Sequence, residues 1–114
     1  MADRQGDRVN IDALRRRIDE LDERLVELLN ERASCALRIG RIKQALGLEI
    51  YQPDRESEVL GHVRDHGQAI KGPLSGEALT RLFERIIDEA RRLERESASA
   101  HGPGGPPADT TIRE

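Results

Sequence analysis

An arginine interrupts an apolar heptad pattern in the first half of the chain. Alternating steps of three and four residues connect Ile11, Leu14, Ile18, Leu21, Leu25, Leu28, Cys35, Ile39 and Ile42. The same spacing places Arg32 on this seam, where an apolar residue is expected. A guanidinium group on a packed seam costs several kcal/mol unless it is paired or binds an anion. Arg32 is therefore a candidate anion-binding residue.

Two further cations are expected near Arg32. Lys43 follows it by eleven residues, so on a helix both side chains share one face and lie about 16 Å apart. Arg55 comes soon after the predicted end of that helix. Three cations at one cleft predict the binding of a small polyanion. The alternatives for Arg32 are an ion pair with a carboxylate from a later helix and a side chain that extends to solvent.

Arg15 can reach this cleft only from a second chain. It precedes Lys43 by 28 residues, which is about 42 Å along a helix, so the two cannot meet within one chain. In an antiparallel pair of identical helices, the first half of one lies beside the second half of the other. Arg15 would then enter the partner's cleft. The alternative is an ordinary solvated arginine, because Arg16 and Arg17 flank it.

The heptad pattern predicts one long helix over residues 11–46. Asn10 is its expected N-cap, and Gly47 is its expected C-terminal signal. Gly40 lies inside this helix, where it costs about 1 kcal/mol relative to alanine, and it therefore suggests a close neighbour. The helix would be about 54 Å long and would protrude from any monomeric domain of this size. Covering its apolar seam requires a partner, so we expect a homodimer.

Two shorter helices are expected to fold back against the long one. Pro53 suits the first turn of the second helix, which should end by Gly67. Ser75 is the expected N-cap of the third helix. The buried stripe of the third helix comprises Leu79, Leu82, Phe83, Ile86, Ile87, Ala90 and Leu93. The predicted fold class is all-α, with three helices in an intertwined homodimer.

Composition excludes several other classes of protein. The chain has 114 residues, of which 36% are charged, 36% are hydrophobic and only 2% are aromatic, which disfavours an all-β sandwich. A single cysteine, Cys35, excludes an internal disulfide and favours a reducing compartment, so we expect a cytoplasmic protein. His62 and His66 are four residues apart, but two ligands do not make a metal site. We expect no membrane span, no signal peptide and, at a net charge of −3, no nucleic-acid partner.

The chain is expected to contain one folded domain. We assign residues 1–9 to a flexible N-terminus, residues 10–98 to the helical domain and residues 99–114 to a disordered tail rich in glycine and proline. We expect a free-standing domain, because only the tail follows it.

Four linked segments resemble the all-helical class of chorismate mutase. They are LRRRIDELDERLVELLNER, GRIK, YQPDRE and LFERIIDEARRLE, and the similarity covers about residues 10–96 in the family's order and spacing. The resemblance implies an intertwined dimer with two sites, each built from both subunits. By position, Arg32, Lys43 and Arg55 match the cations that hold the dicarboxylate substrate, and Arg15 matches the arginine donated across the interface.

The resemblance also gives roles to the remaining candidates. Glu56 matches the carboxylate that contacts the ring hydroxyl of the substrate, and Glu94 matches the residue that faces the ether oxygen of the breaking bond. Many relatives carry glutamine in place of Glu94. Ala90 replaces a frequent serine, and Gln52 stands where an acidic residue is common, which leaves the hydroxyl contact mostly to Glu56.

The implied reaction is the rearrangement of chorismate to prephenate, for phenylalanine and tyrosine biosynthesis, without cofactor or metal. The catalytic residues would be Arg32, Lys43 and Glu94. An ionised Glu94 would repel the charge that grows on the ether oxygen, so we expect burial to raise its pKa and activity to be best at mildly acidic pH. The alternative is a solvated Glu94 that pairs with Arg91.

Two other functions fit the same residues. An isochorismate pyruvate lyase of the same fold needs a very similar cationic pocket. A non-catalytic helical dimerisation module would instead pair Arg32 and Lys43 with acids such as Asp88 or Glu89. The substitution Arg32→Leu separates the second alternative from an enzyme, because a module should tolerate it.

Overall fold

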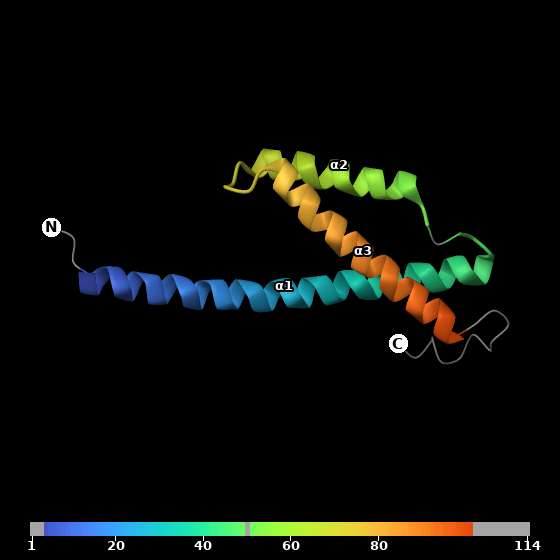
Figure 1. Cartoon of the computed structure of the whole chain (residues 1–114), viewed down its shortest axis with the longest axis horizontal. Coiled ribbons are helices and arrows are strands. Elements are labelled where there is room, and N and C mark those ends of the chain that lie inside the picture. The colour runs from blue at the N-terminus through green and yellow to red at the C-terminus, as the bar shows by residue number, and fades with distance from the viewer. Residues whose placement is uncertain (1–3, 50, 102–114) are drawn as a thin grey trace. The chain divides into compact units, whose positions relative to one another are not determined.

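The computed structural model describes residues 4–49 and 51–101 and contains three α-helices (Figure 1). Helix α1 spans Arg4–Leu46, α2 spans Pro53–Ile70 and α3 spans Gly76–His101. No strand occurs among the described residues. The predicted all-α class, with one very long helix and two shorter ones, is confirmed. Residues 102–114, most of the predicted tail, lie outside the described residues, and the proposed domain boundaries remain predictions.

The start of α1 differs from the prediction. The helix includes Arg4, so Asn10 lies inside it and is not its N-cap. The segment before Asn10 contains no proline, and the helix continues through it despite the cost of Gly6. A capping residue is thus only a local signal and does not by itself start a helix.

The C-terminus of α1 agrees with the prediction. Gly47 has a φ of 73°, in the left-handed region that glycine adopts readily. The Gly47 amide donates to the Gln44 carbonyl at 3.2 Å, and the Leu48 amide donates to the Lys43 carbonyl at 2.8 Å. These two bonds form a Schellman motif, which satisfies carbonyls that the helix end leaves open.

The chain divides into two units after Arg32. The N-terminal unit is the first part of α1, and its apolar side chains are exposed: Leu14 has 64% of its surface exposed, Ile18 53% and Leu25 54%. A helix gains most of its stability from packing an apolar face, so this unit requires a surface to cover its seam.

The second unit contains the rest of α1 together with α2 and α3. Helices α2 and α3 pack against each other as a hairpin, joined by residues 71–75 (Figure 1). The hydroxyl of Ser75 accepts a hydrogen bond from the Ala78 amide at 3.0 Å, which confirms Ser75 as the N-cap of α3. Of the described apolar side chains, Ile87 on α3 is buried, with 8% exposed.

Gly67 does not end α2, contrary to the prediction. The helix continues to Ile70, and the turn comes at Lys71, which has a φ of 59° and donates its amide to the Gly67 carbonyl at 3.3 Å. Gly67 is buried, and a methyl group there would collide with the side chain of Leu79 on α3. This glycine therefore serves the close packing of α2 on α3 rather than helix termination.

Residues 4–49 and 51–101 contain no helical stretch with the length and hydropathy of a membrane span.

A pair of glycine substitutions in α2 tests this packing. Gly61 has open space where a side chain would be, so G61A should raise the free energy of unfolding by up to about 1 kcal/mol through helix propensity. G67A gains the same propensity but forces Leu79 out of its place. We expect G67A to be less stable than G61A by at least about 1 kcal/mol in urea unfolding at one fixed protein concentration. Equal stability of the two variants would contradict the close packing at Gly67.

Candidate active site

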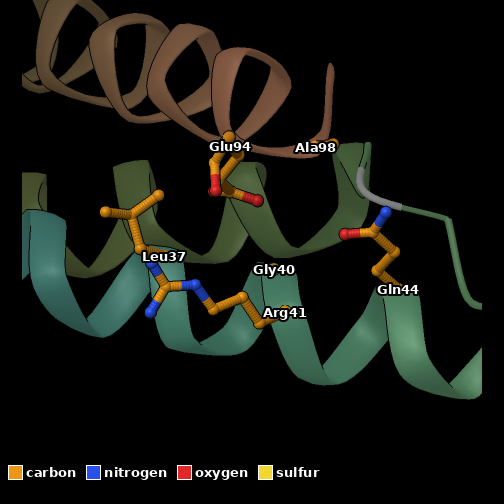
Figure 2. A pocket seen from close by; sticks show the side chains of 7 residues that line it. Leu37, Gly40, Arg41, Gln44, Glu94 and Ala98 are labelled. Carbon is orange, nitrogen blue, oxygen red and sulfur yellow. The ribbon is translucent and has the colours of Figure 1, made fainter. Parts of the chain in front are cut away.

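The candidate site lies where Glu94 of α3 meets Gly40 of α1. Gly40 is buried, and a methyl group at this position would lie 3.2 Å from Oε2 and 3.3 Å from Cγ of Glu94. Figure 2 shows the Glu94 side chain pointing from α3 toward α1 at this glycine. The expectation that Gly40 marks a close neighbour is confirmed, and the neighbour is a carboxylate.

A hollow lies beside Glu94 on the second unit. It is shallow and open to solvent, with an empty volume of about 200 Å³ that includes open space. The lining residues, most of which Figure 2 labels, are Leu37, Gly40, Arg41, Gln44, Glu94, Ser97 and Ala98.

Arg41 is a residue of this hollow that the sequence analysis missed. It is half-buried, and its Nε atom is buried without a hydrogen-bond partner among the described residues. The signal in the sequence is its position beside Gly40, at the point where α1 meets another helix.

Burial and charge act in opposite directions on Glu94. Partial burial raises the pKa of Glu94, and this is the largest effect, because it disfavours the charged form. The charges of Lys43 and Arg91 lower this pKa, and the charge of Glu56 raises it. The pKa of Glu94 is raised overall, which confirms the expected direction. Glu94 is half-buried, so the alternative of a fully solvated side chain is wrong.

Arg91 is the second residue that the sequence analysis did not place in the site. Its Nη2 atom donates to Oε1 of Glu56 at 2.9 Å and to Oδ1 of Asp88 at 3.2 Å. Its Cζ atom lies 5.3 Å from the centroid of the Tyr51 ring, within cation–π distance. Arg91 was considered only as a partner of Glu94, and its ion pairs are with Glu56 and Asp88 instead. Its partner on α2, Glu56, is 35 residues away in the sequence, so no local spacing pattern predicts this ion pair.

Other candidates surround this cluster in the second unit. Lys43 on α1 and Ala90 on α3 are half-buried. Gln52 is exposed immediately before α2, and its carbonyl accepts a hydrogen bond from the Glu56 amide at 3.2 Å. Arg55 is exposed and pairs with Glu58 at 3.3 Å. The structure thus groups Lys43 and Glu94 with Glu56 and leaves Arg55 on an exposed ion pair.

Arg15 and Arg32 belong to the N-terminal unit. Arg15 is exposed and Arg32 is half-buried, both on α1. Their part in the site stays a prediction, as do the roles of the other candidates.

A cluster of two cations and two carboxylates, in which the pKa of Glu94 is raised, has hydrogen-bond donors for an oxygen that becomes negative. Comparisons with known proteins identify the family of the chain. Residues 14–95 match the family model of chorismate mutase type II.

Several curated proteins are similar in sequence. A bifunctional chorismate mutase/prephenate dehydratase of Pseudomonas aeruginosa is 44% identical over 106 residues, which cover 88% of this chain and 28% of the relative. The chain therefore spans about a quarter of the length of the bifunctional relatives that it matches. A 4-amino-4-deoxychorismate mutase of Streptomyces pristinaespiralis is 32% identical, over 90% of this chain and 75% of the relative.

Solved structures are similar as well. A chorismate mutase of Helicobacter pylori in complex with prephenate has a TM-score of 0.71 and 33% identity, covering 80% of this chain and 96% of that one. A chorismate mutase of Thermus thermophilus has a TM-score of 0.71 and 34% identity, covering 75% and 94% of the two chains. From the family match together with these relatives, the chain belongs to the chorismate mutase type II family.

Proposed function

We propose that this chain is a chorismate mutase, which rearranges chorismate to prephenate in the biosynthesis of phenylalanine and tyrosine. The proposal depends most on one observation: the Glu94 carboxyl group lies against Gly40, close to Lys43, and its pKa is raised. Family membership and the prephenate complex of the Helicobacter pylori relative support it. The single cysteine, Cys35, is a free thiol and favours a cytoplasmic location.

The reaction needs hydrogen-bond donors at one oxygen. An ether C–O bond breaks while a C–C bond forms in the same molecule, so no group leaves and no cofactor is required. Negative charge grows on the ether oxygen as the bond breaks. The Lys43 ammonium group and a protonated Glu94 can both donate to this oxygen, and preorganised donors in a dry site lower the barrier by several kcal/mol.

The remaining residues hold the substrate in its reactive shape. Arg32, Arg55 and Arg15 of the partner subunit bind the two carboxylates, which fixes a compact conformer. Glu56 accepts the hydrogen bond of the ring hydroxyl. Gln52 and Ala90 line the site as well. Gln52 has no carboxylate to accept from the ring hydroxyl, and Ala90 has no side-chain hydroxyl to contact the substrate.

A homodimer completes the site. Two observations support it: the apolar seam of the N-terminal unit is exposed, and the hollow beside Glu94 is open to solvent in the single chain. A second copy that covers the seam also brings an arginine to the cleft, which one chain cannot do alone.

The dimer is tested by one substitution on the seam. Leu25 is 54% exposed in the single chain, and a lysine there would place a charge in the interface. We expect light scattering to give twice the 12.8 kDa chain mass for the natural chain and a lower mass with lost activity for L25K. The control D22K, on the same helix but off the seam, should remain dimeric. A natural chain that is monomeric at all concentrations would contradict the proposal.

The activity is tested by following chorismate loss and identifying the product. R32L should lower kcat/KM by at least about 30-fold, equivalent to about 2 kcal/mol of transition-state stabilisation. The control R85L changes an arginine of α3 with 71% of its side chain exposed, so it should leave kcat/KM unchanged. An R32L variant that keeps full activity would contradict this role of Arg32. An R32L variant that is more stable than the natural chain, with no activity in the variant or in the natural chain, would favour the non-catalytic module.

The same assay with isochorismate and with 4-amino-4-deoxychorismate distinguishes the related activities. Pyruvate release from isochorismate would indicate the lyase. Preference for the amino substrate would indicate the activity named for the Streptomyces relative.

The protonation of Glu94 predicts a pH profile. Because the pKa of Glu94 is raised, its acid form persists above the usual range of a glutamate and is lost as the pH rises through that pKa. The kcat should therefore be highest at mildly acidic pH and fall toward neutrality. The side chain of residue 94 cannot ionise in E94Q, so this variant should lose the fall of kcat at higher pH, the high-pH limb of the profile. The control E96Q, with an exposed side chain on the same helix, should keep this limb. A profile that E94Q leaves unchanged would contradict the role of Glu94.

A further inference from the structure

Arg91 connects three segments of the chain around Glu94. Its guanidinium group binds Glu56 of α2 and Asp88 of α3 and lies over the ring of Tyr51, which precedes α2. Only 28% of its side chain is exposed, compared with 71% for Arg85 on the same helix. An arginine of α3 with this many partners and this degree of burial differs from an ordinary surface arginine.

The ion pair with Arg91 orients Glu56. Arg91 occupies one carboxylate oxygen, Oε1, at 2.9 Å, and 23% of the Glu56 side chain is exposed. A carboxylate has two oxygens that accept hydrogen bonds, so Oε2 remains able to accept another one. Fixing one oxygen limits the orientations of the other, which is the usual effect of a supporting hydrogen bond behind a substrate-binding group.

Arg91 also contributes charge at Glu94. The charged groups near Glu94 come from all three helices: Lys43 from α1, Glu56 from α2 and Arg91 from α3, while Arg41 of α1 lines the same hollow. Burial and the charge of Glu56 raise the pKa of Glu94, and the charge of Arg91 opposes them. Arg91 therefore acts on both carboxylates of the cluster, on Glu56 by contact and on Glu94 by its charge.

We propose, resting on the proposed function, that Arg91 is a positioning residue of this site. It fixes Glu56 to receive the ring hydroxyl of the substrate, and it keeps a positive charge near Glu94. Arg91 reaches the substrate through Glu56, so its effect on the reaction is indirect.

Two substitutions separate the geometry of Arg91 from its charge. R91K keeps the charge but loses the planar guanidinium group, whose Nη2 atom binds both carboxylates and which lies over the Tyr51 ring. R91M removes the charge and keeps an unbranched apolar stem. R85M is the matched control, because Arg85 is an exposed arginine of the same helix.

Steady-state kinetics with chorismate should show both effects. We expect R91K and R91M to raise KM about tenfold, since Glu56 loses the hydrogen bond that the guanidinium group donates at 2.9 Å. R91M should also move the high-pH limb of kcat to higher pH, because the charge that favours ionised Glu94 is gone. R91K should leave this limb in place. In an E94Q background the limb is absent, so R91M should raise KM there without any pH effect. R85M should behave as the natural chain.

A measurement without substrate keeps this proposal separate from the proposed function. The Glu94 carboxyl carbon, followed by NMR in the ligand-free protein, should titrate at higher pH in R91M than in the natural chain or in R91K. Circular dichroism of each variant verifies the helical fold, and the KM of R91K tests the positioning of Glu56 if R91M does not fold.

The outcomes are distinct. An unchanged Glu94 titration in R91M, an unchanged KM in R91K, or a limb shift that persists in E94Q overturns the role of Arg91. Absence of chorismate turnover in the natural chain overturns the proposed function instead, and the NMR titration then still decides whether Arg91 acts on Glu94.

Discussion

The close approach of α3 to α1 at Gly40 is the constraint on which the site depends. The missing side chain at residue 40 makes room for the Glu94 carboxyl group, 3.2 Å from where a methyl group would be. An ionised acid is costly in such a partly buried position, so the packing of two helices favours its protonated form. A glycine on one helix thus contributes to the raised pKa of a side chain on another helix.

The charges around Glu94 act on its pKa in opposite directions. A positive charge on Lys43 strengthens any hydrogen bond that it donates, yet this charge favours the ionised form of Glu94. The carboxylate of Glu56 acts in the opposite direction, and Arg91 compensates Glu56. The pKa of Glu94 therefore depends on three charged neighbours at once, and changing any one of them alters the ionisation of this carboxyl group.

Structural features that depend on neighbouring residues in the sequence, such as helix ends, could be predicted from the sequence. Ser75 and Gly47 mark helix ends because capping needs one hydroxyl or one glycine at a fixed position. The same local reasoning is wrong at Asn10, where the helix already runs through the preceding residues, and at Gly67, where a close contact with Leu79 explains the glycine. Arg91 could not be placed in advance, because its ion pair with α2 joins residues 35 positions apart. The three-helix fold and the direction of the Glu94 pKa were predictable, since an amphipathic pattern and partial burial determine them.

The Schellman motif at the end of α1 bears on the flexibility of the reacting groups. Helix ends ordinarily fray, and Lys43 belongs to the last turn of its helix. Here its own carbonyl accepts the Leu48 amide, while the Gly47 amide closes the turn onto Gln44. Two hydrogen bonds therefore hold the backbone of this helix end in the free protein. Less backbone entropy is then lost at Lys43 on binding a ligand than at a frayed helix end.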